Sequence, residues 1–215
     1  MQSKRFGALA LVSALLLFTA ATAQAQPGRF QTGHFYTGRF YIGVAGGSSN
    51  IDTRVTTVTA HLDESSTGYK IYGGYDLSRN FAVEFAYADL GEGKLTGNNG
   101  DRFIRDNVLY QFTANNAELK FNPTLISAAG VFTARVGRRF DLHGRIGVAS
   151  WNVDYTASAT GVPGSTGSDS GSDIFFGGGV GLHFGWGWRL TADYESYSID
   201  NGDSTLLSIG LAKSF

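Results

Sequence analysis

Large apolar side chains alternate with small or polar ones along eight segments of the chain. This period of two is typical of β-strands, in which successive side chains point to opposite faces. In the last segment Leu207, Ile209, Leu211 and Phe215 share one face, and small side chains occupy the other. An edge strand this apolar invites aggregation, so we expect every strand to be paired on both sides. The predicted strands are Phe40–Ser48, Gly68–Asp76, Phe81–Asp89, Leu125–Val136, Asp141–Asn152, Asp173–Phe184, Trp188–Tyr197 and Thr205–Phe215.

The connections between these strands alternate in length. Three are short, at Leu77–Asn80, Gly137–Phe140 and Gly185–Gly187, and the other four are longer. Barrels of the outer membrane have short turns on the periplasmic rim and longer loops outside the cell. An even number of strands places both ends of such a barrel on the periplasmic side.

The two faces of each strand differ in polarity. In Trp188–Tyr197, Leu190 and Tyr194 fall on one face, and Asp193 and Glu195 fall on the other. A soluble barrel of lipocalin type would turn the apolar face inward around an apolar ligand, whereas a barrel in lipid turns it outward. Glycine and alanine on the polar face favour the second arrangement, because a narrow lumen leaves little room for large side chains.

Aromatic residues gather near the short turns, as in the interfacial girdle of a membrane barrel. They are Phe40, Tyr75, Phe81, Phe140, Phe184, Trp188 and Phe215. We therefore predict an all-β fold, an eight-stranded antiparallel up-and-down transmembrane β-barrel, with the soluble lipocalin-type barrel as the alternative.

The N-terminal segment supports export. Lys4 and Arg5 precede an apolar run, and Ala23–Ala25 offers a cleavage site, so residues 1–25 are predicted to be a secretory signal peptide. A retained membrane anchor would need about 20 apolar residues. Residues 26–39 are interpreted as a glycine-rich lead-in, and residues 40–215 as the barrel domain. We expect the mature protein in the outer membrane of a Gram-negative cell.

Charge and cysteine content narrow the possibilities further. Cleavage removes two of the 17 basic residues and none of the 18 acidic ones, which leaves a formal net charge of −3 and no sign of nucleic-acid binding. The chain has no cysteine, so disulfides cannot stabilise it after export.

Several short stretches, taken in order, are similar to those of one family. They are Tyr72–Tyr75, Glu84–Tyr87, Thr133–Gly137, Arg145–Gly147 with Trp151, Gly178–Val180, and Leu207–Gly210 with the final Phe215. The chain resembles the OmpA-like transmembrane barrels of Gram-negative outer membranes. The resemblance implies a barrel surrounded by outer-membrane lipid, delivered by periplasmic chaperones to the barrel insertion machinery, with Phe215 as the insertion signal. The peptidoglycan-binding domain that follows the barrel in longer members is not expected here.

The resemblance also implies a charged plug inside the barrel, built from Glu84, Arg135, Arg145 and Asp193. Gly181 and Thr191 stand where the family typically has an acid and a base. By parity along the strands, the full set of inward charges is Lys70, Glu84, Arg135, Arg145, Arg189, Asp193 and Glu195. An eight-stranded barrel is only just wide enough for its own side chains, so we expect these charges to pair with one another.

Other chemistry finds little support in the sequence. His143 and His183 are expected near each other as polar residues of the rim, and without a third ligand no metal site is predicted. Some eight-stranded outer-membrane proteins are lipid A deacylases or palmitoyltransferases with Ser, His and acidic residues at the outer rim. Here His61 has such neighbours in one loop only. We expect no catalytic residues, and no cofactor. The glycines of Gly177–Gly181 lie within a strand and are interpreted as a packing feature.

The long loops are the candidates for contact with an extracellular ligand. In Leu90–Thr124, the alternating stretches Val108–Phe112 and Glu118–Phe121 are expected to extend the hairpin above the membrane, and Asp154–Ser172 has the composition of a flexible segment. The predicted function is a non-enzymatic structural or surface-interaction role carried by these loops. Two alternatives are a low-conductance pore gated by the interior ion pairs, and an adhesin or immune-evasion factor. The oligomeric state does not follow from the sequence.

Overall fold

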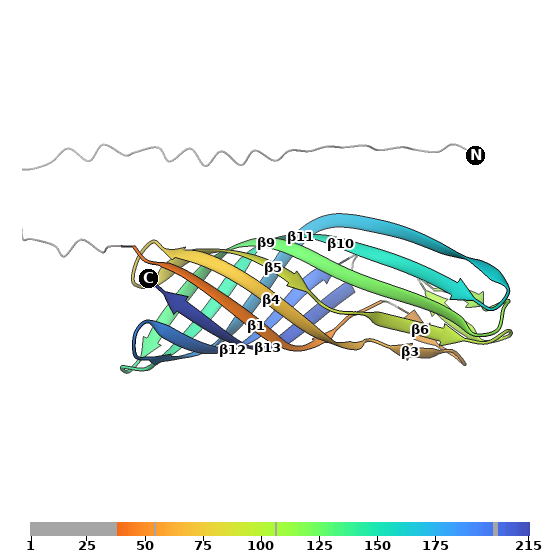
Figure 1. The fold of residues 1–215 in the computed structure, drawn as a ribbon, viewed down its shortest axis with the longest axis horizontal. Helices are drawn as coiled ribbons and strands as arrows, with labels where there is room; N and C mark the ends of the chain where they lie inside the picture. The colour runs from red at the N-terminus through yellow and green to blue at the C-terminus, as the bar shows by residue number, and fades with distance from the viewer. Residues whose placement is uncertain (1–37, 54, 106, 200–201) are drawn as a thin grey trace, which may run out of the picture. The chain divides into compact units, whose positions relative to one another are not determined.

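Eight strands form the barrel in the computed structural model, which describes residues 38–53, 55–105, 107–199 and 202–215 (Figure 1). They are β1 (Phe40–Asn50), β4 (Ser65–Asp76), β5 (Phe81–Asp89), β9 (Ala117–Val136), β10 (Phe140–Ala159), β11 (Val162–Phe184), β12 (Trp188–Ile199) and β13 (Gly202–Ser214). All pair antiparallel with their neighbours in chain order. The predicted fold class is confirmed. The signal peptide and the lead-in up to residue 37 lie outside the described residues.

The barrel closes where its last strand meets its first. β13 pairs with β1 from Tyr41 opposite Ser214 to Asn50 opposite Thr205, and β1 pairs on its other side with β4. The apolar C-terminal strand therefore has a hydrogen-bonded neighbour along both edges, which is the condition for a strand to cross lipid. Among the described residues, no helix is long and apolar enough to cross a membrane.

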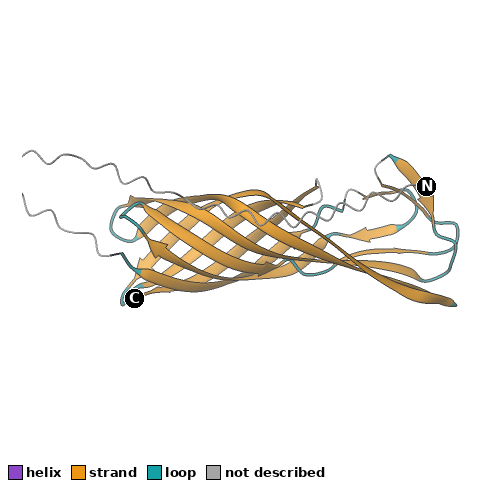
Figure 2. Cartoon of the chain, turned by 90° about the horizontal axis from the view of Figure 1, so that it is seen from above, coloured by secondary structure: helices purple, strands orange, loops and turns teal. Residues whose placement is uncertain are grey.

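The short turns lie at the same end of the barrel as the C-terminus (Figure 2). Gly137 and Gly187 adopt φ angles of 73° and 78°, in the left-handed region that glycine enters without steric cost. Trp186 has a φ of 69° and an almost fully exposed ring. Sharp reversals at these positions keep each connection short, as the sequence predicts.

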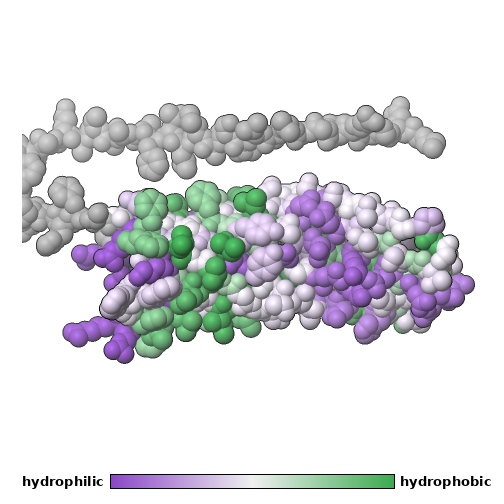
Figure 3. Space-filling view, in the orientation of Figure 1, coloured by the Kyte–Doolittle hydropathy of each residue, from purple (hydrophilic) through white to green (hydrophobic). Residues whose placement is uncertain are grey.

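The outer surface near the short turns is apolar (Figure 3). Ile42, Ile126, Ile146 and Ile209 are each 60–68% exposed, which is the reverse of a soluble protein and typical of a surface that faces lipid. The aromatic side chains of the predicted girdle lie at this end, and Phe40 packs on Tyr75 with ring centroids 4.6 Å apart.

The strands run further toward the other end than the sequence predicts. Asp154–Ser172 is not a loop, because β10 and β11 pair residue by residue up to Ala157 and Ser165 and turn at Gly161, whose φ is 75°. The prediction of a flexible segment was wrong because β10 and β11 are already paired within the barrel, and their pairing continues through backbone hydrogen bonds alone. A segment rich in serine and glycine can therefore continue the two strands.

The second long connection divides between two sheets. Glu118–Phe121 belongs to β9 and extends the barrel wall as expected, where it pairs with β6 (Gly93–Gly97), which in turn pairs with β3 (His61–Asp63). Val108–Phe112 does not extend that hairpin. Its residues up to Gln111 form β8 (Val108–Gln111), part of a separate three-stranded sheet with β7 (Arg102–Arg105) and β2 (Val55–Thr57).

Inside the barrel, the half toward the long connections holds an apolar core that alternation alone does not predict. Leu125 and Leu206 point inward and are almost fully buried, although their neighbours Ile126 and Leu207 are exposed outside. Phe175 stacks on Tyr197 with centroids 5.1 Å apart. The buried members of this apolar cluster are Ile51, Ala88, Leu90, Leu95, Phe121, Leu125, Ala129, Ala149, Trp151, Val153, Phe175, Tyr197, Ile199 and Leu206.

We expect Ile209→Arg to destabilise the barrel by about 2–4 kcal/mol in a bilayer, because it places a charge on the lipid face in the middle of β13. Ser168→Arg, at an exposed site in the part of β11 away from the short turns, is the matched control and is expected to change stability by less than about 0.5 kcal/mol. The free energy of unfolding in urea, measured in lipid vesicles, checks both. Equal effects of the two variants would contradict a lipid-facing β13.

Candidate functional site: a charged network inside the barrel

The half of the lumen toward the short turns is filled by charged side chains. The alternation of each strand turns them inward, and on β10 they follow one another at every second position, whereas on β12 Thr191 stands between Arg189 and Asp193. The members are Lys70 on β4, Glu84 on β5, Asp141, His143 and Arg145 on β10, and Arg189, Asp193 and Glu195 on β12. We call this set the interior network.

One part of the interior network centres on Glu195. Both of its oxygens lie 2.9 Å from Lys70 Nζ, and Arg145 Nη1 donates to Oε1 at 2.6 Å. Glu84 Oε1 lies 3.9 Å from both Lys70 Nζ and Arg145 Nε, and its Oε2 accepts a hydrogen bond from the Tyr41 hydroxyl at 3.0 Å. Lys70 and Glu195 are each 1% exposed, so these charges have protein partners in place of water.

The other part runs toward the short turns through His143. Arg145 Nη2 lies 3.1 Å from Asp193 Oδ1, and the same oxygen lies 2.5 Å from His143 Nε2. His143 Nδ1 is 3.1 Å from Asp141 Oδ1. Arg189 holds Asp141 with two hydrogen bonds, from Nε at 2.9 Å and from Nη2 at 2.5 Å. Arg145 therefore links the two parts into one connected set.

His143 determines the charge balance of the interior network, whose described members include four carboxylates and three permanent cations. An ionised carboxylate only accepts hydrogen bonds, so a ring that donates from both nitrogens to Asp141 and Asp193 carries a positive charge. That charge makes the set formally neutral. Arg189 Nη2 also lies 2.7 Å from Nδ1, a contact that suits the neutral ring. The balance is thus set by one buried imidazole.

Glycines of β11 make room for these side chains between β10 and β12. A Cβ on Gly179 would strike the carbonyl oxygen of Ala192 and come within 2.7 Å of Asp193 Oδ1. A Cβ on Gly181 would strike Asp141 Oδ2 and come within 2.5 Å of Arg189 Nε. The lack of a side chain at Gly179 and Gly181 is therefore the steric condition for the ion pairs between β10 and β12.

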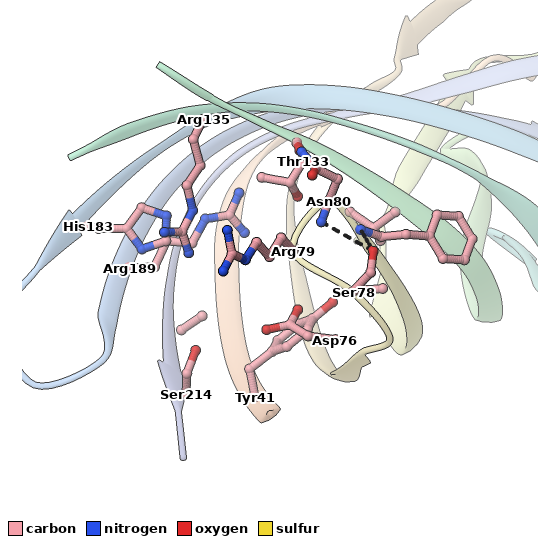
Figure 4. Close-up of a pocket in the computed structure, with 14 residues that line it drawn as sticks. Tyr41, Asp76, Ser78, Arg79, Asn80, Thr133, Arg135, His183, Arg189 and Ser214 are labelled. Carbon is pink, nitrogen blue, oxygen red and sulfur yellow. Dashed lines mark hydrogen bonds between the residues drawn. The ribbon is translucent and has the colours of Figure 1, made fainter. Parts of the chain in front are cut away.

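Six of the seven charges predicted to be inside belong to the interior network, and Arg135 does not. It lies two residues before Gly137, is exposed, and makes no ion pair with a carboxylate of the described chain (Figure 4). Asp141 stands opposite Arg135 across the β9–β10 ladder, but Arg189 and the two histidines already surround that carboxylate. By its position in the alternation of β9, the side chain of Arg135 points toward the inside of the barrel. Because Arg135 lies near the end of the strand, the side chain sits at the opening of the lumen near the short turns.

Asp141 and His143 were missed as network members. The side chain of His143 is fully buried, so the prediction of a rim residue is wrong for it, whereas the side chain of His183 is 38% exposed at the rim. His183 Nε2 lies 2.7 Å from Asp141 Oδ2, so both histidines contact one carboxylate. Asp141, His143 and Arg145 occupy alternate positions of one strand, and this spacing in the sequence could have predicted that all three point into the lumen. In the described part of the chain, no group of three His, Cys, Asp or Glu residues is arranged to hold a metal ion.

Comparison with known proteins supports the architecture. The family model described as outer membrane protein beta-barrel domain matches residues 11–215. None of the curated proteins matches the sequence. Among solved structures, the chain is similar to Ail, the attachment invasion locus protein of Yersinia pestis, in complex with the heparin analogue sucrose octasulfate. The TM-score is 0.53 at 16% identity, over 83% of this chain and 99% of that one.

Two structures from Pseudomonas aeruginosa are also similar. The N-terminal β-barrel domain of OprF has a TM-score of 0.50 and 14% identity over 83% of this chain and 100% of that one. The outer membrane protein OprG has a TM-score of 0.50 and 12% identity over 82% of this chain and 96% of that one. At these identities the likeness concerns the fold.

Lys70→Met is expected to lower the free energy of unfolding by about 3–5 kcal/mol, because it leaves Glu195 and Glu84 buried with less compensation. Lys94→Met is the matched control. Lys94 pairs with Glu118 at 3.0 Å on the surface, where such pairs contribute less than about 1 kcal/mol. Urea unfolding in vesicles measures both, and the double variant Lys70→Met/Glu195→Gln should recover part of the loss. A small, equal cost for both lysines would show that the network is not energetically coupled.

Proposed function

Because the chain belongs to the outer membrane protein beta-barrel domain family, we propose that it is a non-enzymatic outer-membrane protein that binds a surface partner through the strands and connections at the end away from the short turns. The protein is an outer-membrane barrel that sits in the membrane lipid, and the proposal concerns what the barrel carries. Export by a cleaved signal peptide, and recognition of Phe215 by the insertion machinery with the help of chaperones, are part of the proposal. The exposed aromatic ring of Phe215 suits such recognition.

The observation that carries the proposal is the exposure of β8. Val108, Leu109 and Tyr110 are each 46–56% exposed, although β8 belongs to the separate small sheet and not to the lipid-facing wall. β8 lies at the edge of that sheet, where among the described strands only β7 pairs with it. Neighbouring apolar side chains on a water-exposed edge strand are typical of a protein-binding surface.

Charge indicates which kind of partner fits. The described residues of 51–64, 90–121, 154–172 and 202–203 include nine acidic and four basic side chains. Lys94 pairs with Glu118, and Lys120 pairs with Glu92 at 3.1 Å. The hydrogen bond from Lys94 holds the pKa of Glu118 below its ordinary value, so the carboxylate stays ionised at neutral pH. An acidic surface with an apolar edge favours a protein partner over a sulfated polyanion such as the ligand in the Ail structure.

The packed interior supports a structural role for the charges over conduction. Ions would have to pass the interior network and then the apolar cluster, in which Leu90, Leu95 and Leu206 are completely buried. Both layers fill the lumen, so a pathway needs the ion pairs and the apolar side chains to rearrange together. The low-conductance pore is therefore the second candidate.

Enzymatic activity finds no support at the outer end. His61 lies on β3 opposite Thr96, and its side chain is exposed. Within the described residues, its imidazole makes no hydrogen bond with a serine or a carboxylate. In the described residues around His61, catalysis of the lipid A deacylase or palmitoyltransferase kind therefore lacks a positioned nucleophile and acid.

Planar-bilayer recording tests the non-conducting part of the proposal. We expect the purified wild-type barrel to show no reproducible single-channel steps, because both lumen layers are packed. Reproducible steps that change in amplitude with Glu84→Gln would overturn this part in favour of the pore.

The triple variant Val108→Ser/Leu109→Ser/Tyr110→Ser tests the surface-interaction role. Cells that display the wild-type protein are expected to adhere to at least one member of a panel of immobilised matrix proteins, and the triple variant should lose at least about 90% of that adhesion, since a buried aromatic anchor contributes about 2 kcal/mol or more. Val162→Ser removes an exposed apolar side chain at the β10–β11 tip and is the matched control. Adhesion retained by the triple variant would exclude β8 as the contact.

A further inference from the structure

Basic side chains accumulate at the short-turn end of the barrel, opposite to the end considered above. The turns and the adjoining strand ends carry two acidic residues, Asp76 and Asp141, against seven basic ones. The basic residues are Arg39, Arg79, Arg135, Arg138, Arg139, Arg189 and Lys213. This excess gives the mouth of the barrel a positive potential.

A hollow leads from this end into the lumen. Its inner part has a volume of about 70 Å³ above a floor that includes Tyr41, Ala82 and Val131. The inner part opens into an outer vestibule of about 660 Å³, which falls in the range of roughly 300–1,000 Å³ usual for small-molecule sites. Arg79 and Arg135 line both parts.

Four basic side chains that line the inner part of the hollow come from four different elements and point toward one another (Figure 4). Arg79 comes from the β4–β5 turn, Arg135 from the end of β9, His183 from β11 and Arg189 from β12. Arg189 is engaged by Asp141. Neither Arg79 nor Arg135 forms an ion pair with a carboxylate of the described chain. Two exposed guanidinium groups thus line one cavity, together with the carboxylate of Asp76, so basic side chains outnumber acidic ones there.

We propose that this hollow, the mouth site formed by Arg79, Arg135, Asn80 and His183, binds a phosphate-type oxyanion. A guanidinium presents a planar pair of donors that matches two oxygens of a phosphate, and two such groups balance the two negative charges of the dianion. His183 lines the same hollow, and its Nε2 lies 2.7 Å from Asp141 Oδ2. The mouth site is separate from the surface on β8, so this inference does not rest on the proposed function.

The phosphate group has two possible sources at this end. Short turns of outer-membrane barrels face the periplasm, where free phosphate compounds reach the lumen mouth from solution. Headgroups of the surrounding phospholipid provide the same chemistry from the rim. The mouth site recognises the shared group, and the surroundings of the purified protein distinguish the sources.

Calorimetric titration with inorganic phosphate, at constant ionic strength and pH 7.5 and in a maltoside detergent that carries no phosphate, tests the proposal. Saturable binding is expected, and Arg79→Gln/Arg135→Gln should weaken it at least about tenfold, because each removes charge-assisted hydrogen bonds. Arg138→Gln/Arg139→Gln is the matched control. It removes the same charge from the neighbouring turn, outside the hollow, and should change affinity less than about twofold.

Three outcomes would overturn the proposal: no saturable binding, equal weakening by the two double variants, or equal affinity for acetate at the same ionic strength. The last two would indicate diffuse charge in place of a site. In phospholipid nanodiscs, retained binding identifies free phosphate as the ligand, and binding lost only there identifies the lipid headgroup. The mobility of unheated samples on a gel verifies that each variant is folded.

Discussion

Pairing of β13 with β1 is the contact on which the rest of the molecule depends. Before it forms, the apolar strands at both ends of the sheet have an unpaired edge, and each unpaired backbone group in hydrocarbon costs several kcal/mol. Once it forms, the lumen is enclosed and its width is set by eight strands. Every inward side chain must then fit that width, and every buried charge needs a partner among the other inward side chains.

Two different classes of side chain fill the lumen. Toward the short turns it is filled by ion pairs, and toward the long connections by packed aromatic and aliphatic side chains. Replacing a buried ion pair by apolar residues is often neutral or stabilising, so stability alone does not explain the first layer. Register offers a better explanation. If β12 paired one residue out of register, the side chains of Asp193 and Glu195 would point into the lipid. The free-energy cost of exposing these charges to lipid makes the correct register of β12 far more favourable than registers shifted by one residue.

The sequence predicts the barrel well because a membrane wall imposes a period of two on every strand. It predicts the interior less well, because parity tells which way a side chain points and not how deep it lies. Arg135 and Asp141 face each other across one ladder, yet only Asp141 joins the interior network. Their depth depends on the stagger of the strands and on Arg189, two strands away. The apolar cluster shows the same limit, since Leu125 is buried inside the barrel while its apolar neighbour Ile126 is exposed outside, so the polarity of the two faces does not differ there.

The strand extensions follow from cooperativity along a ladder. A hairpin of serine, threonine and glycine has little tendency to form alone, but β10 and β11 are already aligned by the barrel when they reach Asp154. Each further pair adds hydrogen bonds without a new loop-closure cost. Composition describes a segment in isolation and therefore misses support from the folded part next to it.

The separation of charge between the two ends makes the barrel an electric dipole along its own axis. The basic rim is drawn toward anionic headgroups on its side of the bilayer, and the acidic extensions are repelled by anionic groups on the other side. Both forces act along the membrane normal. The attraction of the basic rim opposes movement of the protein outward, and the repulsion of the acidic end opposes movement inward. This charge separation therefore adds an electrostatic contribution to the depth of the protein in the membrane, beside that of its apolar belt.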